Sequence, residues 1–325
     1  MKLLITLIYF LTFDLLAWEN IEFQGEKDTK IVFTKFGNSP GTNGSILIST
    51  GRTEASIKYE NIAHNFINAG FSPIYVINHR GQGFSQRMLN DPHKGYVENF
   101  SHYYEDFNKF VEIVKNDPDT NLNKMYLLAH SMGGAIATGY LQNFKHSFRK
   151  IAYTSPMFGI KLDKSELLTL AQTAVSCYTP FGPECIDYVP GGGAFNFGKV
   201  NFETNELTRN EEEYHKIYET WSLFPELQLG SATLRWVREA IQANRVMRKN
   251  HQLTKMKNVK VLLLQAGEDK IVDNERQNEV CNKINQIKPR NCKKVTFKNS
   301  FHEILIEKDS VRFEAQDKII EFYKN

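Results

Sequence analysis

A serine stands between an apolar run and two glycines in the stretch YLLAHSMGGAI, residues 126–136. The apolar run predicts a buried strand, and the small residues after it allow a sharp turn into a helix. A nucleophile elbow has this layout: its pattern is G-x-S-x-G, and the serine hydroxyl lies at the tip of the turn. Here the five residues read AHSMG, so alanine replaces the first glycine. We predict that Ser131 is a nucleophile. The alternative is a buried serine between a strand and a helix.

A serine hydroxyl is a weak nucleophile, so it needs a general base and a carboxylate that orients this base. After such an elbow the acid and then the histidine follow along the chain, each on a loop after a strand. The loop GEDKIVD follows the apolar run VKVLLLQA and offers Asp269; the loop SFHEILIE follows KKVTFKN and offers His302. Glu268 and Asp273 are alternatives for the acid, although Asp273 is better placed to begin a helix.

The tetrahedral intermediate of acyl transfer also needs N–H donors for its oxyanion. One donor is expected from the backbone N–H of Met132, directly after the serine, and the other from the early loop STGRTEAS. In that loop the backbone N–H of Arg52 is the best candidate. We expect Glu303 to point away from the neighbouring His302, and His130 to pack behind the reacting groups.

Short apolar runs alternate along the chain with longer amphipathic segments. Strands are predicted at 44–50, 72–79, 124–130, 149–155, 258–266 and 293–299, and helices at 56–70, 101–117, 132–144, 274–285 and 309–323. Buried strands alternating with helices indicate an α/β fold, a mostly parallel sheet flanked by helices. The alternation stops between the fourth and fifth of these strands. We therefore predict a core of residues 18–155 and 251–325, with an inserted, largely helical cap at 156–250.

The composition is that of an ordinary globular protein. The 325 residues include 40 basic and 37 acidic side chains, with a formal net charge of +3 at pH 7. This small net charge gives no reason to expect a nucleic-acid partner.

The N-terminus and the cysteines bear on the compartment. Lys2 is followed by an apolar run at 3–13, which is typical of a secretory signal peptide. We predict a signal peptide or membrane anchor at 1–17, and a bacterial protein that is exported, periplasmic or membrane-associated. The alternatives are an apolar element packed on the domain and a cytoplasmic location. In an oxidising compartment two close cysteine pairs can form disulfides: Cys177 with Cys185, and Cys281 with Cys292.

Several longer strings point to a family. GRTEASIKYE, HRGQGFSQR, LLAHSMGGAI, SPMFGI, LLLQAGEDKIVDN and FHEILIEKD, with GSATLRWVREAI at 230–241, resemble bacterial lysophospholipases of the monoacylglycerol-lipase-like branch of the α/β-hydrolases. The resemblance runs from about Gly51 to the C-terminus. It implies an α/β-hydrolase fold, no metal or organic cofactor, and a triad of Ser131, Asp269 and His302.

The resemblance also implies lipid substrates, chiefly lysophospholipids. We expect a serine esterase that releases fatty acid and a glycerophospho-alcohol through an acyl-enzyme, with an aromatic cap that covers the acyl chain and contacts the membrane surface. The alternatives are a monoacylglycerol lipase or a general carboxylesterase. A lipid-binding protein without catalytic activity is the alternative from another class, and a missing triad member would favour it.

Overall fold

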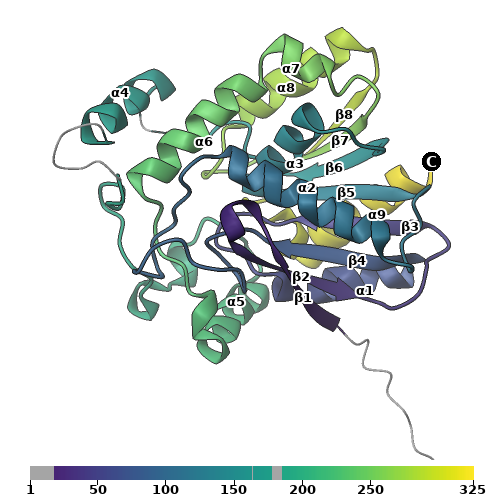
Figure 1. The fold of residues 1–325 in the computed structure, drawn as a ribbon, viewed down its shortest axis with the longest axis horizontal. Coiled ribbons are helices and arrows are strands. Elements are labelled where there is room, and N and C mark those ends of the chain that lie inside the picture. Colours follow the sequence, from purple (N-terminus) through teal and green to yellow (C-terminus); the bar gives the residue numbers. More distant parts are fainter. Residues whose placement is uncertain (1–17, 163, 178–184) are drawn as a thin grey trace, which may run out of the picture.

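The computed structural model describes residues 18–162, 164–177 and 185–325 (Figure 1). At its centre these residues form an eight-stranded sheet with the order β1-β2-β4-β3-β5-β6-β7-β8. Neighbours from β4 to β8 run parallel, whereas β1 and β2 are antiparallel to their neighbours. The strands are β1 (Trp18–Gln24), β2 (Lys30–Phe36), β3 (Gly44–Ser49), β4 (Phe71–Asn78), β5 (Met125–His130), β6 (Lys150–Thr154), β7 (Lys260–Ala266) and β8 (Cys292–Phe297).

Helices cover both faces of the sheet. One face packs against α2 (Ser101–Asn116), α3 (Met132–Asn143) and α8 (Asn274–Ile287), and the other against α1 (Glu60–Asn68) and α9 (Asp309–Lys324). The central strands are apolar on both sides because alternate side chains enter opposite layers. In β5, for example, Leu127 packs under α2 and α3, whereas Leu128 packs under α1 and α9. The predicted architecture, a mostly parallel sheet flanked by helices, is confirmed.

The sequence prediction missed the first two strands. The register pairs β1 with β2 over seven residues each, and β2 then pairs with β4. In this antiparallel edge the side chains of β1 alternate between partly buried and exposed, so its hydrophobic signal is weaker than that of the buried parallel strands. The predicted signal peptide at 1–17 lies outside the described residues.

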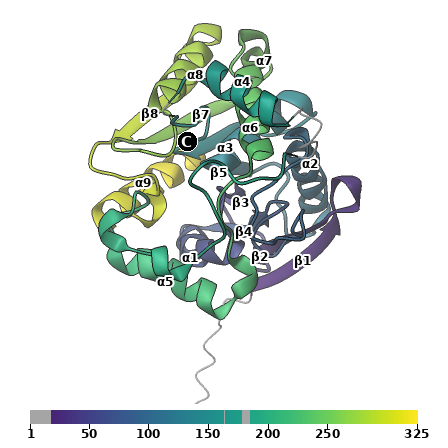
Figure 2. The same cartoon turned by 90° about the vertical axis from the view of Figure 1, so that its left-hand side faces the viewer.

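The chain between β6 and β7, residues 155–259, holds four further α-helices among its described residues; we call it the β6–β7 segment. These helices are α4 (Glu166–Cys177), α5 (Glu211–Leu223), α6 (Leu234–Met247) and α7 (Asn250–Thr254). Helices α4, α5 and α6 lie at one end of the sheet, at the left of Figure 1 and facing the viewer in Figure 2. The segment covers the loops after β3 and β4: Trp221 packs on Ala55, and the chain at Ala232 pairs with Gly95.

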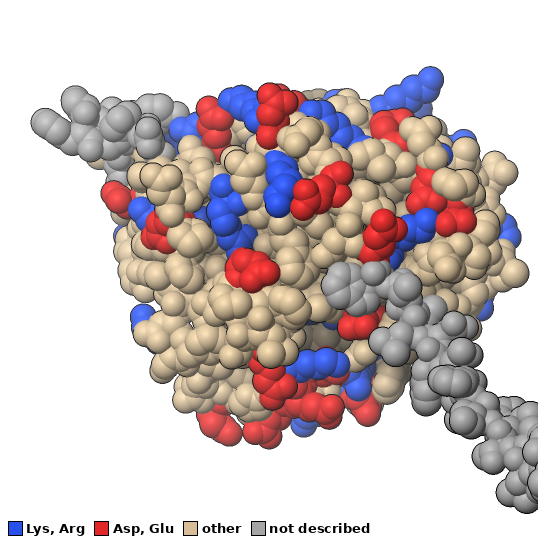
Figure 3. All heavy atoms as spheres, turned by 60° about the horizontal axis from the view of Figure 1, so that its bottom comes forward, with Lys and Arg blue, Asp and Glu red and all other residues tan. Residues whose placement is uncertain are grey.

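The disulfides join the cysteines as predicted. Cys177 is bonded to Cys185 inside the β6–β7 segment, and Cys281 bonds α8 to Cys292 of β8. In the described part of the chain no helix is long and apolar enough to cross a membrane. Acidic and basic side chains are intermixed on the face shown in Figure 3, in keeping with the small net charge.

Candidate active site

The turn at Ser131 has the backbone conformation of a nucleophile elbow. Ser131 has φ +50° and ψ −121°, a sparsely populated conformation for a residue other than glycine. The surrounding backbone holds it there: Ser131 N donates to Thr154 O at 3.1 Å, and Ser131 O accepts from Gly134 N and Met157 N at 2.9 and 2.8 Å. Gly133 leaves no room for a side chain, because a Cβ there would lie 2.1 Å from Ser49 O. Strand β3 and helix α3 therefore touch backbone to backbone beside the serine.

The structure brings Ser131, His302 and Asp269 together from three distant loops. Ser131 Oγ lies 2.8 Å from His302 Nε2, and His302 Nδ1 lies 2.8 Å from Asp269 Oδ2. The side chains of His302 and Asp269 are buried, and Ser131 is 7% exposed. An ionised carboxylate only accepts, so Nδ1 carries the proton and Nε2 is free to accept the serine hydroxyl. The arrangement has the order and geometry of a serine–histidine–aspartate triad.

The surroundings of Asp269 distinguish it from its neighbours. Its second oxygen, Oδ1, accepts from the backbone N–H groups of Ile271 and Val272 at 2.9 and 3.0 Å. Burial raises the pKa of the Asp269 carboxyl, but the hydrogen bonds from His302 and the two N–H groups outweigh burial and lower the pKa overall. Glu268 instead pairs with Arg209 near the surface, and Asp273 caps α8 by accepting from the N–H of its first turn.

The loop after β3 lies against the elbow, where an oxyanion hole requires it. A Cβ on Gly51 would lie 2.9 Å from His130 Cδ2, and one on Gly133 would lie 2.5 Å from Thr50 O. Arg52 therefore follows directly after the point where this loop meets the elbow. Met132 is the first residue of α3, so its N–H belongs to the helix N-terminus, where the dipole favours negative charge.

Behind the triad lies a buried group of four charged side chains, Glu54, Lys58, His130 and Glu303, which we call the charge cluster. Lys58 Nζ lies 2.7 Å from Glu303 Oε2 and also contacts Glu54. His130 Nε2 lies 3.2 Å from Glu303 Oε2 and 3.7 Å from Glu54 Oε1. Carboxylate and imidazole atoms this close can hold a metal ion, but the Lys58 ammonium already lies between the two carboxylates. The cluster is better described as a closed ion network.

The protonation states in the cluster follow from these contacts. Burial lowers the pKa of His130 and of Lys58, but Glu303 and Glu54 outweigh it, and both pKa values are raised overall. Burial raises the pKa of the Glu303 carboxyl, but His130 and Lys58 outweigh it and hold this pKa well below its usual range. The cluster thus pairs two cations with two carboxylates.

The charge cluster joins the three parts of the site. Glu54 accepts from Gly51 N in the loop after β3 and from the Tyr59 hydroxyl at 2.8 Å. His130 belongs to the elbow and packs against His302 with ring centroids 4.9 Å apart. Glu303 directly follows His302, so the loop after β8 also takes part in the ion network. The network therefore fixes the loop after β3 and the loop of His302 relative to the nucleophile.

We expect Glu303→Gln to lower the free energy of unfolding by about 3 kcal/mol, because it leaves two buried cations with one carboxylate. In the wild type, Glu303 has a lowered folded pKa, so its contribution is complete above the unfolded value of about 4.3 and is lost as pH falls further. His130 has a raised folded pKa, so its contribution is complete below about 6.5 and is lost as pH rises through the folded value. The difference in the free energy of unfolding between wild type and Glu303→Gln should therefore be largest between about pH 4.3 and pH 6.5. Urea unfolding of both proteins from pH 3.5 to 9 measures it.

The control is Glu268→Gln, which removes a surface partner of Arg209 and should cost less than about 1 kcal/mol. A cost for Glu303→Gln that is the same at every pH would contradict the ion network and indicate a packing effect.

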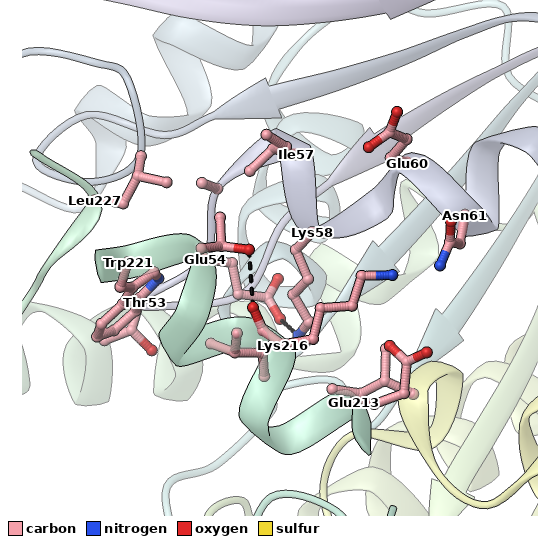
Figure 4. Close-up of a pocket in the computed structure, with 14 residues that line it drawn as sticks. Thr53, Glu54, Ile57, Lys58, Glu60, Asn61, Glu213, Lys216, Trp221 and Leu227 are labelled. Atoms are coloured by element: carbon pink, nitrogen blue, oxygen red, sulfur yellow. Dashed lines mark hydrogen bonds and ion pairs between the residues drawn. The ribbon is translucent and has the colours of Figure 1, made fainter. Parts of the chain in front are cut away.

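A small pocket of about 60 Å³ lies between α5 and the chain that leads into α1 (Figure 4). Its walls combine apolar side chains such as Ile57 and Trp221 with the charged Lys58 and Lys216. Glu54 also lines it, whereas Ser131 does not. The pocket therefore borders the charge cluster and not the nucleophile.

The structure places the sequence-predicted site residues as follows. Ser131, Asp269 and His302 lie within hydrogen-bonding distance of one another, and His130 packs behind them as expected. Glu303 does point away from the triad, but into the charge cluster. The sequence interpretation missed Lys58 and Glu54, although their spacing of four residues is a signal for a local ion pair.

Comparison with known proteins decides the family. The model of the serine aminopeptidase S33 family matches residues 40–309. The chain belongs to this S33 family. It is 32% identical over 316 residues to lysophospholipase L2 of Escherichia coli K12, covering 94% of this chain and 87% of that protein. It is also 32% identical over 270 residues to the probable lysophospholipase L2 of Haemophilus influenzae, covering 82% and 79% of the two chains.

Solved structures agree on the fold of this S33 protein. It superposes on a soluble variant of monoglyceride lipase from Saccharomyces cerevisiae, in complex with a substrate analogue, with a TM-score of 0.69. The match covers 97% of this chain and 99% of that one at 14% identity. At this identity the likeness shows the α/β-hydrolase fold alone, as predicted.

Proposed function

We propose that this S33 protein is a serine esterase that hydrolyses the acyl ester of lysophospholipids. The observation that carries the proposal is the chain of two hydrogen bonds from Ser131 through His302 to Asp269, each with a heavy-atom distance of 2.8 Å. A hydroxyl bonded to an oriented, unprotonated imidazole nitrogen is poised for nucleophilic attack.

In the proposed mechanism His302 removes the proton from Ser131 as the hydroxyl attacks the ester carbonyl. The backbone N–H groups of Arg52 and Met132 bind the oxyanion. His302 then protonates the leaving glycerophospho-alcohol, and the same histidine activates the water that releases the fatty acid. Asp269 stabilises the imidazolium in each half of the reaction.

The choice of a lysophospholipid rests on the relatives named lysophospholipase L2, which match most of this chain. The monoglyceride lipase of yeast shares the fold and supports the second candidate, hydrolysis of monoacylglycerols. The two candidates differ in the leaving group, which is charged in one and neutral in the other.

We also propose that the protein is exported and acts at a membrane surface. The two disulfides suit an oxidising compartment. On α4, Leu167, Leu168 and Val175 are 63, 48 and 70% exposed, and on α5 Leu223 is 77% exposed. Apolar side chains presented in this way by helices over the site favour contact with a lipid surface.

Fatty-acid release tests the proposed function. The purified protein is assayed on lysophosphatidylcholine, lysophosphatidylethanolamine and monoacylglycerol with the same acyl chain. We expect faster turnover of the two lysophospholipids, judged by kcat/KM. A preference for the monoacylglycerol would support the second candidate, and no release from any of the three would refute the esterase assignment.

A further inference from the structure

The side chain of Arg52 lies beside the candidate oxyanion hole in an unusual environment. Its guanidinium Nη2 donates to the backbone carbonyl of Gly230 at 2.7 Å, and its Cζ lies 5.3 Å from the centroid of the Trp236 ring. Its Nε is buried and has no hydrogen-bond partner. The guanidinium is thus held by a carbonyl dipole and an aromatic face, both from the β6–β7 segment.

The loop after β4 packs against the Arg52 guanidinium from a third side. A Cβ on Gly95 would lie 2.2 Å from Arg52 Nη2 and 3.0 Å from Cζ, so a side chain there would displace the guanidinium. Gly95 is also bonded to the β6–β7 segment, since its N–H donates to Ser231 O at 3.1 Å. The three walls hold the guanidinium in one place, which is what a specific binding group requires.

The charge of Arg52 has no counter-ion among the described residues. The more deeply buried Arg80 forms an ion pair with Asp106, and Arg248 forms one with Glu166. For Arg52, burial lowers the pKa to about 10, opposed by the nearby Tyr103. The side chain therefore remains a cation at neutral pH. A partly buried cation without a carboxylate costs stability, and such groups occur where a ligand supplies the negative charge.

The position of Arg52 relative to the reacting atoms suggests which ligand this is. Its own backbone N–H is a proposed oxyanion donor, so its side chain begins beside the ester carbonyl. In a lysophospholipid the phosphate lies on the alcohol side of that ester, separated from it by the glycerol carbons. Arginine is well suited to phosphate because its planar fork donates two parallel hydrogen bonds.

We propose that the Arg52 guanidinium binds the phosphate of the leaving glycerophospho-alcohol and so selects lysophospholipids over neutral monoacylglycerols. This inference rests on the proposed esterase function and specifies its leaving-group site. Gly95, Gly230 and Trp236 hold the guanidinium in position for the phosphate.

The test compares kcat/KM for lysophosphatidylethanolamine with kcat/KM for a monoacylglycerol of the same chain, both in the same neutral detergent micelles. We expect Arg52→Gln to lower this ratio about 10- to 100-fold, because a hydrogen bond to a charged group contributes about 1.5–3 kcal/mol. Arg52→Lys should give an intermediate ratio, since it keeps the charge and loses the fork.

Arg87→Gln is the matched control. Arg87 is also partly buried and donates to a backbone carbonyl of the β6–β7 segment, that of Glu226. Its substitution removes a similar tether and should leave the ratio within about twofold of wild type. Equal losses on both substrates in Arg52→Gln, or the same change of ratio in Arg87→Gln, would show that Arg52 only tethers the segment and would overturn the proposal.

A binding measurement separates this inference from the esterase function. Calorimetric titration of glycerophosphoethanolamine into Ser131→Ala and into Ser131→Ala/Arg52→Gln reports phosphate recognition without hydrolysis. We expect at least about tenfold weaker binding to the double variant. Equal affinity would refute the role of Arg52, even if the wild type proves to be an active lysophospholipase.

Discussion

Ser131→Ala should release fatty acid from lysophosphatidylethanolamine at least about 10⁴-fold more slowly than the wild type, because it removes the attacking oxygen. The substitution takes away one hydroxyl whose partner is His302 Nε2, so the fold should be retained. The rate is measured as fatty-acid release under saturating substrate.

Two further measurements make this result specific. A fluorophosphonate probe, which reacts with activated serines, should label the wild type at Ser131 and fail to label Ser131→Ala, as read by mass spectrometry. Ser222→Ala, which changes an exposed serine on α5, should keep full activity and labelling. Hydrolysis that persists in Ser131→Ala would mean that another group is the nucleophile.

Asp269→Asn should lower kcat about 10⁴-fold, the second-largest effect we expect. The oxygen of an asparagine at this position would continue to accept from Ile271 N and Val272 N, as Oδ1 does now. Its NH₂ group would then face His302 Nδ1 and act as a donor. The imidazole would hold its proton on Nε2 and could not accept one from Ser131. Steady-state kinetics measure the loss.

The matched control for this substitution is Asp273→Asn. Asp273 is four residues away and caps α8 through its carboxylate, and asparagine is an equally good N-cap. We expect this variant to keep kcat within about twofold of wild type. A large loss in Asp273→Asn or Glu268→Gln together with an active Asp269→Asn would show that the acid was assigned wrongly.

The sequence was sufficient for the elements whose signals are local. The buried runs at β3 to β7 and the amphipathic helices α1, α2, α3, α8 and α9 were predicted close to their observed bounds, because a buried parallel strand is apolar throughout. The edge strand β8 was also predicted, although it is more exposed. The triad order could also be predicted, since each member follows a strand whose end is visible in the pattern. The antiparallel strands β1 and β2 were both missed. At the edge, β1 is only partly buried at alternate positions, whereas β2 lies inside the sheet and is mostly buried.

The charge cluster was beyond the reach of sequence reasoning for a physical reason. Lys58 and Glu303 are 245 residues apart, and nothing in either local pattern indicates that they meet. Glu303 beside His302 looks like an ordinary surface carboxylate. Likewise, the loop STGRTEAS gave Arg52 as a backbone donor, but the lack of a counter-ion around its side chain appears only when the β6–β7 segment is in place.

The charge cluster also has a consequence for changing this enzyme. The carboxylates of Glu54 and Glu303 are neutralised by His130 and Lys58, so the charges of these loops balance only together. The loops that carry them therefore cannot be exchanged singly for loops of another hydrolase. A transplanted loop would arrive without its ionic partners and leave the others unneutralised. The β6–β7 segment contributes no member to the cluster. Altered substrate range is therefore best sought by recombining that segment, while the three loops are inherited as a unit.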